Sequence, residues 1–552
     1  MWDIVDSVAT HGRALVFGAL LASAVAFAGT AVQTQSKPTA TEPHTDHAAP
    51  PAAFNGRIAL YTTAMGPFTR PISSRNSEAQ AFFNQGFQLT YAFARPEAVR
   101  SFREAETRDP ECAICYWGEA WAWGSDLNWT MSAEEAPLAY AAIQKAIALA
   151  PAHATPIEQA LIRAMSVRYV ARFEPARRVD QDRAYADAMK QVVDAYPNDL
   201  DAAVLYAEAL FLLEPRAGRR DLANPNVQRI VGVLERALAN DIHHPGACHL
   251  YVHITEATSE PGRASACAEF LGRSIPGASH INHMPSHTWT QLGRWGDAVR
   301  ASLDAWHSDL KSLVGEGVAI YPWHDLQMLV FAASMDGQGA IAVQAGRDYS
   351  RMTKNPIYLL LTLVRFGRFE DILVDLSTKT QGLLSGPVWD FAQGYAQLRA
   401  GNHAAAQTHL TSLISAANTS TAQFGANSAK AIFGVLGSIL EGESALARAD
   451  RAAAITAFEK AVAIEDALVW DEPEPLPFSA RHWLGAALIE AARPADAETV
   501  YREDLKRHPK NGWSLLGLSQ ALAAQGKPSR EVTEEFDRAW SRSDTWIRSS
   551  RF

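Results

Sequence analysis

Small, apolar and aromatic residues recur along this chain at fixed intervals. Counting from Gly86, an alanine follows after 12 residues, an aromatic after 16, an alanine after 19 and a proline after 24. These positions are Ala98, Phe102, Ala105 and Pro110, and the offsets of 12, 16 and 24 recur at Gly485, Ala497, Tyr501 and Pro509. Alternation with a period of two, which is typical of strands, is nearly absent. The pattern predicts successive pairs of α-helices, the second of which ends at a proline.

Shorter parts of the same pattern occur elsewhere in the chain. A glycine followed five residues later by alanine marks the turns at Gly293 and Gly401, and Trp513 opens a W-x-x-L-G segment. The pattern resembles the tetratricopeptide repeat (TPR), a helix–turn–helix unit of about 34 residues. Each such unit buries its apolar face only against its neighbours. We therefore expect an all-α, TPR-type helical-hairpin solenoid, a right-handed superhelix of about ten helix pairs.

Composition changes divide the chain into five segments. Residues 1–28 hold the apolar run ALVFGALLASAVAFAG and a small-x-small cleavage pattern, which predicts a signal peptide or, alternatively, a membrane anchor. Residues 29–76 begin rich in Pro, Thr and Ala and are predicted to be a flexible linker. We expect an N-terminal TPR array with a His-rich groove over 77–349, an irregular helical connection over 350–385 and a C-terminal TPR array over 386–552. The protein is thus expected to be exported, periplasmic or secreted; if the N-terminal segment is instead an anchor, it is the one point of membrane attachment that we expect.

Overall composition narrows the partners. The 552 residues are 48% apolar and 20% charged, enough apolar side chain for a large core. The formal net charge of −10 is spread along the chain without a long basic run. Phosphate binding requires clustered Lys and Arg, so nucleic acid is not expected as a partner. A small molecule or a peptide bound in the groove of the solenoid remains as the expected partner.

Four cysteines bear on the redox chemistry. Cys112 and Cys115 form the sequence CAIC, and Cys248 and Cys267 follow later. In an exported chain we expect one or two structural disulfides, with a thiolate metal site as the alternative. Haem attachment through CxxCH is excluded because Tyr116 follows the second cysteine.

Histidines are concentrated in one part of the chain: seven of the 17 lie between His243 and His287. A helix expected from Pro245 to Ala257 places His249, His253 and Glu256 on one face, at i, i+4 and i+7.

The next helix is expected to start at Asn282 or His283, because Pro285 is tolerated only in a first helical turn. His280 would then lie in the preceding loop, and His283 and His287 would lie one turn apart. A third helix carries His324.

These histidines are expected on consecutive first helices of the repeats, which line the concave face. Neutral imidazoles together with a carboxylate are ligands for copper, iron or zinc. The predicted metal-binding residues are His249, His253, Glu256, His280, His283, His287 and His324. Glu256 and Glu208 are the candidate catalytic residues, as general bases or ligands. We expect His243, His244 and His307 to be bystanders or to support the ligands.

Three functions are compatible with this arrangement. The first is an exported metalloenzyme, either a copper or iron oxidoreductase or a zinc hydrolase. The second is a TPR scaffold that binds proteins without catalysis, in which the histidines are packed or hydrogen-bonded. The third is a metal carrier or sensor.

The motifs HPGACHLYVH and HINHMPSH resemble those of a group of exported bacterial TPR proteins that pair HPGxxHxxxH with HxxHMPSH. The resemblance implies the TPR fold and the His-rich site but no particular reaction. The chain departs from the group at Asp325, where the group tends to have Asn, and in a shortened aromatic segment after Glu208.

Overall fold

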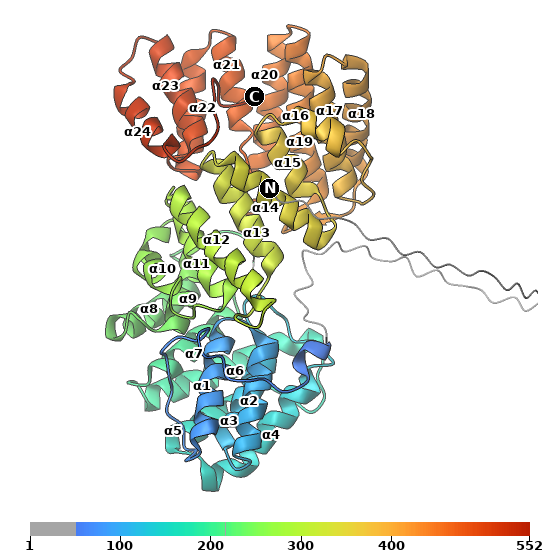
Figure 1. Cartoon of the computed structure of the whole chain (residues 1–552). Helices are drawn as coiled ribbons and strands as arrows, with labels where there is room; N and C mark the ends of the chain where they lie inside the picture. Colours follow the sequence, from blue (N-terminus) through green and yellow to red (C-terminus); the bar gives the residue numbers. More distant parts are fainter. Residues whose placement is uncertain (1–50, 216) are drawn as a thin grey trace, which may run out of the picture. The chain divides into compact units, whose positions relative to one another are not determined.

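The computed structural model describes residues 51–215 and 217–552, which contain 24 α-helices (Figure 1). The first twelve are α1 (Ser77–Tyr91), α2 (Arg95–Arg108), α3 (Ala113–Trp123), α4 (Ala136–His153), α5 (Pro156–Ser166), α6 (Arg178–Ala195), α7 (Leu200–Phe211), α8 (Pro225–Asn240), α9 (Pro245–Glu256), α10 (Ser265–Leu271), α11 (Ser279–Gln291) and α12 (Trp295–Ser312). The others are α13 (Pro322–Met335), α14 (Gly339–Thr353), α15 (Ile357–Arg365), α16 (Phe369–Asp375), α17 (Ser385–Arg399), α18 (His403–Thr419), α19 (Ala429–Ala447), α20 (Arg451–Asp466), α21 (Arg481–Glu490), α22 (Pro494–Arg507), α23 (Gly512–Ala524) and α24 (Arg530–Trp540). The 3-10 helices η1 (Pro51–Phe54), η2 (Pro175–Arg177) and η3 (Pro261–Ala264) and an antiparallel pair of strands, β1 (Gln423–Phe424) and β2 (Asn427–Ser428), complete the described elements.

Each odd-numbered helix packs against the even-numbered helix that follows it, from α1 with α2 to α23 with α24. Most pairs of consecutive odd-numbered helices also contact one another, and the series α7, α9, α11 and α13 is continuous in this respect. The prediction of an all-α TPR-type solenoid is confirmed, with more helix pairs than expected. The continuous layer of odd-numbered helices brings residues from distant repeats together.

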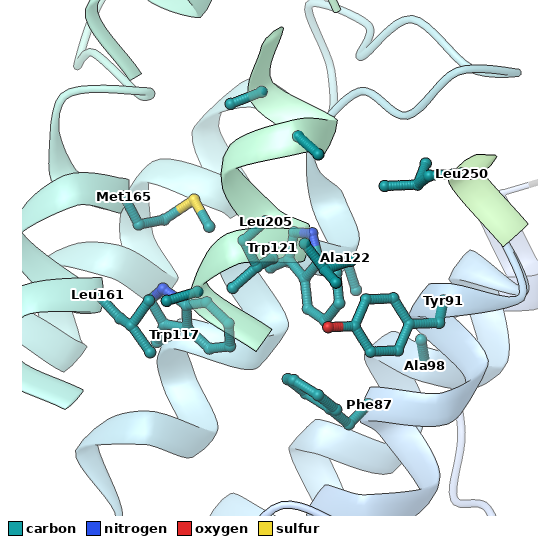
Figure 2. Packing of buried hydrophobic residues seen from close by; sticks show 14 of the residues in the cluster. Phe87, Tyr91, Ala98, Trp117, Trp121, Ala122, Leu161, Met165, Leu205 and Leu250 are labelled. Carbon is teal, nitrogen blue, oxygen red and sulfur yellow. The ribbon is translucent and has the colours of Figure 1, made fainter. Parts of the chain in front are cut away.

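Close packing of glycine against aromatic rings explains the repeating pattern. A Cβ atom added at Gly118 would lie 2.3 Å from the Phe102 ring, and one added at Gly517 would lie 2.1 Å from the Tyr501 ring. Any larger residue would force the helices apart. Between α1, α3 and their neighbours the gap is filled by rings such as Phe87, Trp117 and Trp121 (Figure 2).

In eight of the twelve described helix pairs, the turn has a left-handed residue two positions after the first helix ends. Glycine takes this position at several turns, for example Gly293 and Gly401, with φ of 67° and 82°. At the turn between α1 and α2 the residue is Phe93, with φ of 61°. A bulky side chain in this conformation costs about 1–2 kcal/mol, so another interaction must favour phenylalanine here.

The hydrophobic core consists of two large clusters. One spans Phe54 to Ile320 and the other spans Ala268 to Leu522, so their sequence ranges overlap over α10, α11 and α12. The predicted irregular connection at 350–385 holds α15 and α16, and α15 contacts both α14 and α17. The stacking of helices therefore continues through this segment.

The predicted linker is packed along the second half of its length. Arg70 forms ion pairs with Asp199 and Asp201 at 2.9 and 2.7 Å, and the amide of Gly277 donates to the carbonyl oxygen of Ala64. Residues 53–76 thus lie against α7 and the start of α11, because buried charge pairs and backbone hydrogen bonds hold them there.

The signal peptide or anchor and the start of the linker, residues 1–50, lie outside the described residues. Within the described residues, no helix is long and apolar enough to span a bilayer.

All four cysteines form disulfides. Cys112 pairs with Cys115, and Cys248 on α9 pairs with Cys267 on α10. The expectation of one or two structural bridges is confirmed, and the alternative of a thiolate metal site is wrong because no free cysteine remains.

Candidate metal centre

Helix α9 carries the first set of histidines. Pro245 occupies its first turn, and the Nδ1 atom of His244 accepts a hydrogen bond from the Ala247 amide at 3.2 Å, which caps the helix. His249, His253 and Glu256 point to one side and are at most 4% exposed. The helical spacing thus brings two imidazoles and a carboxylate to one place, as predicted.

Helix α11 carries the second set and differs from its predicted bounds. It begins at Ser279, so Pro285 lies inside the helix and His280 lies in the first turn rather than in a loop. The start at Ser279 is fixed by residues 318–320: the Ser279 amide donates to the Val318 carbonyl at 3.2 Å, and the Ser279 hydroxyl accepts from the Ile320 amide at 2.9 Å. These tertiary hydrogen bonds override the local preference of proline for a first turn.

Helix α13 contributes the third element of the site. His324 lies in its first turn, and its ring centroid is 5.0 Å from that of His283 and 6.0 Å from that of His287. Asp325 is fully buried, and its carboxylate lies 3.2 Å from Nδ1 of His283.

The six imidazoles form one continuous cluster. Neighbouring ring centroids are 4.8 to 6.0 Å apart across all three helices. The cluster contains three groups of potential metal ligands, and within each group the ligand atoms lie within 4.8 Å of one another. The groups are His249, His253 and His280; His283, His287 and His324; and His253, Glu256, His287 and Glu472. Each group has enough donors to hold a transition-metal ion.

Acceptors on Nδ1 orient several of these rings. The Tyr91 carbonyl oxygen lies 2.6 Å from Nδ1 of His249, and Glu256 accepts from Nδ1 of His253 at 2.9 Å and of His287 at 2.5 Å. With Nδ1 engaged in this way, Nε2 is the atom left to bind a metal, and this arrangement is usual around metal-binding histidines. In agreement, Nε2 of His249 lies 3.1 Å from Nε2 of His280.

Burial sets the charge of the cluster. It lowers the pKa of His249, His280 and His283 well below the usual range, and repulsion between the neighbouring histidines lowers it further. These three imidazoles are neutral at pH 7 and have a lone pair available.

His287 differs from the other histidines of the cluster. Burial alone would lower its pKa, but the carboxylates of Glu256 and Glu472 raise it to about 10. Beside these two carboxylates, the His287 ring therefore carries a positive charge at pH 7.

Glu472 is the functional candidate that the sequence patterns did not indicate. It lies in the loop between α20 and α21, and its Oε2 atom is 3.1 Å from Nδ1 of His287. Asp471 accepts from the Ala426 amide at 2.8 Å, and Glu474 pairs with Nε2 of His508 at 3.0 Å, so the loop is held on both sides of Glu472. The signal for this residue is the segment WDEPEPLPF, a proline-rich interruption of the repeats that carries three carboxylates.

The second predicted catalytic residue lies to one side. Glu208 on α7 accepts a hydrogen bond from Trp121 Nε1 at 3.1 Å, and burial raises its pKa to about 7. It shares the wall of a small cavity with His249 but belongs to none of the three groups of ligand atoms. Of the expected bystanders, His243 and His307 are exposed, and buried His244 pairs with Asp201 at 3.1 Å.

Two larger cavities also border the cluster. One of about 360 Å³ has His253, Glu256 and Glu472 in its wall. The other, of about 190 Å³, is bordered by His324 and Glu472 and by the aromatic residues Trp323 and Tyr358. Glu472 thus separates two spaces that each reach the imidazoles.

No protein-family model matches the sequence, and no curated protein is similar to it. Similar solved structures include a human IFIT1 dimer with m7Gppp-AAAA, at 12% identity over 78% of this chain and 90% of that chain, with a TM-score of 0.30. The APC/C hetero-tetramer Cut9-Hcn1 is 13% identical over 86% of this chain and 78% of that chain, with a TM-score of 0.30. Yeast Tom70 is 11% identical over 82% of this chain and 90% of that chain, with a TM-score of 0.27.

Proposed function

We propose that this chain is an exported metalloenzyme whose transition-metal centre lies on α9, α11 and α13. The observation that carries the proposal is the convergence of six imidazoles, with Glu256 and Glu472, in one mostly buried cluster. Buried polar groups need partners. The Nε2–H tautomer of His280 can donate to Nε2 of His249 at 3.1 Å, but Nδ1 of the same ring then has no hydrogen-bond partner among the described residues.

The set of donors favours copper, iron or zinc. Imidazole nitrogen suits all three metals, and each cysteine is already in a disulfide. The two groups of three histidines offer places for two ions, with Glu256 and Glu472 beside them. Such an ion would supply either redox chemistry or the activation of water.

The bordering cavities favour an enzyme over a metal carrier. A site that only stores an ion needs no space for a second molecule, whereas two cavities reach this cluster. Glu256 is placed to orient His253 and His287, and Glu472 is placed at the boundary of both cavities.

The proposal that the protein is exported is based on its amino-acid sequence. The apolar N-terminal segment and the resemblance to exported bacterial TPR proteins support a location outside the cytoplasm, where imidazole-rich, thiolate-free sites are chemically suited to copper or iron.

Metal analysis of the purified protein tests this proposal. The protein is prepared without a His tag, reconstituted with Cu²⁺, Fe²⁺ or Zn²⁺ and dialysed before elemental analysis. We expect at least one equivalent of one metal, and a loss of that metal in the double variant His253→Ala/His287→Ala with helicity unchanged. Exposed His243→Ala is the matched control and retains its metal. Less than about a tenth of an equivalent of every metal would reject the proposal and leave a protein-binding scaffold.

A further inference from the structure

The cavity of about 360 Å³ beside the metal centre has two kinds of wall. Leu127, Trp129 and Phe211 give it apolar and aromatic surface, and His253 and Glu256 connect it to the imidazole cluster. Arg178 and Arg220 also line it. A space with an apolar wall, a cationic wall and a reactive centre at one side is typical of a substrate pocket.

The guanidinium group of Arg178 in this wall lacks some of the hydrogen-bond acceptors that it needs. The residue is 8% exposed, and its Nε and Nη1 atoms have no hydrogen-bond partner among the described residues, whereas Nη2 faces a carboxylate. Its counter-ion is Asp182, at 2.7 Å. A buried guanidinium offers five N–H donors and is costly to leave without acceptors, so the missing acceptors point to a ligand.

Arg168 adds positive charge behind Arg178. It is fully buried and donates from Nη2 to the carbonyl oxygen of Ser125 at 2.6 Å, which holds the loop that forms one cavity wall. Its Nε and Nη1 atoms also have no hydrogen-bond partner in the described part of the chain. Burial lowers the pKa of Arg178, and the charge of Arg168 lowers it further. Of the two guanidinium groups, Arg178 is in direct contact with the carboxylate of Asp182.

The start of helix α6 reinforces this charge. Arg178 is the first residue of the 18-residue helix, and Arg177, the residue before it, makes no capping hydrogen bond through its side chain. The Arg178 amide donates to the Pro175 carbonyl oxygen of η2, and the N-terminal end of the helix favours an anion through the helix dipole.

The carboxylates of the wall are already engaged. Asp126 accepts from the Asn128 amide at 2.7 Å, and Glu214 accepts from the Asn226 side chain at 2.5 Å. Glu256 accepts from both neighbouring histidines. The two other carboxylates of the wall face cationic groups, Asp182 at 2.7 Å from Arg178 and Glu472 at 3.1 Å from His287. The Nε and Nη1 atoms of Arg178 therefore remain as donors for an incoming acceptor.

We propose that this cavity binds an organic acid, whose carboxylate is held by Arg178 and the first turn of α6 and whose apolar part lies against Trp129 and Phe211. The other end of this acid reaches the imidazole cluster, so that the acid is the substrate of the proposed enzyme; only this last clause rests on the proposed function. Arg220, which donates from Nη1 to the His253 carbonyl oxygen at 3.0 Å, lies on the side of the metal ligands.

Binding of benzoate to the metal-free protein tests the carboxylate site by itself. Titration calorimetry compares benzoate and 3-phenylpropionate with benzamide and 3-phenylpropionamide, which have the same shape without the charge. We expect the acids to bind at least about tenfold more tightly than the amides, since hydrogen bonds to a charged group are the stronger ones. The chelated protein is used because a bound metal could hold a carboxylate directly.

The variant Arg178→Gln should lose most of this preference, with acid affinity reduced about tenfold or more and amide affinity unchanged. Arg177→Gln is the matched control, because it removes the same charge one residue away from a side chain that is 71% exposed. Equal affinity for acid and amide in the wild type, or no acid binding below about 10 mM, would overturn the proposal without using a variant. An effect of Arg177→Gln as large as that of Arg178→Gln would also overturn it. Since no metal is present, these outcomes are independent of whether the imidazole cluster binds one.

Discussion

The carbonyl oxygen of Tyr91 lies 2.6 Å from Nδ1 of His249, although the two residues are 158 positions apart. The contact ties the end of α1 to the first metal-binding helix. The ring of Tyr91 also packs on Gly246, where an added Cβ would lie 2.4 Å from it. The motif HPGACH thus has a physical basis: His244 caps the helix, Pro245 starts it, and Gly246 makes room for the Tyr91 ring. The backbone carbonyl of Tyr91 can therefore bond to the His249 ring.

The two imidazole groups lead to a prediction about metal stoichiometry. His280→Ala removes a donor from the first group only, and His324→Ala removes one from the second group only. If each group holds an ion, reconstituted wild-type protein contains about two equivalents and each variant about one. Elemental analysis of the three proteins after the same dialysis measures this. One equivalent in the wild type, lost equally in both variants, would indicate a single ion shared by the cluster.

The carboxylate of Glu472 should affect metal affinity but not the stability of the fold. Glu472→Gln preserves shape and removes the charge beside His287, and the side chain is 30% exposed. We expect metal affinity to fall about 10- to 100-fold, the range found when a carboxylate that supports a metal-binding histidine is lost. Competition with a chromophoric chelator measures the affinity, and the melting temperature of the metal-free protein should change by little. The exposed Glu503→Gln on α22 is the control, and an equal effect there would contradict a local role for Glu472.

The sequence was sufficient for the fold because each repeat encodes its own packing. Small residues such as Gly118 and Gly517 and rings such as Phe102 and Tyr501 contact each other within one or two repeats, so their spacing is visible in the chain. The helical spacing of His249 and His253 could be predicted for the same reason.

Two features of the site could not be predicted from local sequence patterns, because they depend on contacts between distant parts of the chain. Helix α11 begins at Ser279 because a segment some 40 residues later bonds to it. Glu472 reaches His287 from a loop in the C-terminal half of the chain, and no local pattern specifies which helix such a loop meets.

The left-handed turn residues predict opposite effects of the same substitution. Ala492 holds φ of 57° at a turn where other repeats use glycine. Ala492→Gly should raise the free energy of unfolding by about 0.5–1 kcal/mol, because relief of backbone strain outweighs the added flexibility of the unfolded chain. Phe93→Gly relieves the same strain but removes a buried ring whose centroid is 4.4 Å from that of His249. Its net effect should be a loss of about 1–3 kcal/mol. Urea unfolding of both variants tests the pair, and stabilisation by Phe93→Gly would refute a packing role for this ring.

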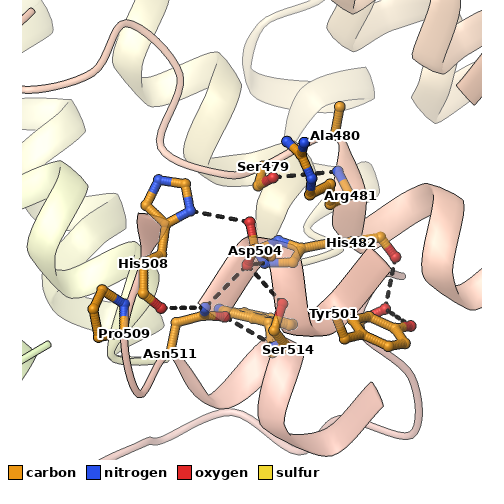
Figure 3. Close-up of polar contacts among 12 residues, drawn as sticks. Ser479, Ala480, Arg481, His482, Tyr501, Asp504, His508, Pro509, Asn511 and Ser514 are labelled. Carbon is orange, nitrogen blue, oxygen red and sulfur yellow. Dashed lines mark hydrogen bonds and ion pairs between the residues drawn. The ribbon is translucent and has the colours of Figure 1, made fainter. Parts of the chain in front are cut away.

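Asp504 lies at the centre of a buried network in the C-terminal repeats (Figure 3). It accepts from Nε2 of His482 at 3.1 Å, from Nδ1 of His508 at 3.0 Å and from the Ser514 hydroxyl at 2.6 Å. Asp504→Asn leaves these donors without a charged acceptor, and we expect a loss of about 3–5 kcal/mol of the free energy of unfolding. Because His508 also pairs with Glu474 in the loop that carries Glu472, metal affinity should fall as well.

The same network predicts how this loss depends on pH. Burial alone would raise the pKa of Asp504, but His482 and His508 hold it well below the usual range. A depressed folded-state pKa stabilises above the unfolded value, near 4, and that stability disappears as the pH falls further. For His508, burial alone would lower the pKa, whereas Glu474 and Asp504 raise it well above the usual range. A raised pKa stabilises fully below the unfolded value, near 6.5, and less as the pH rises beyond it. The difference in unfolding free energy between wild type and Asp504→Asn should therefore be largest between about pH 4 and 6.5 and decrease on both sides, as measured by urea unfolding at a series of pH values. A difference independent of pH would mean that the network is held by packing rather than by charge.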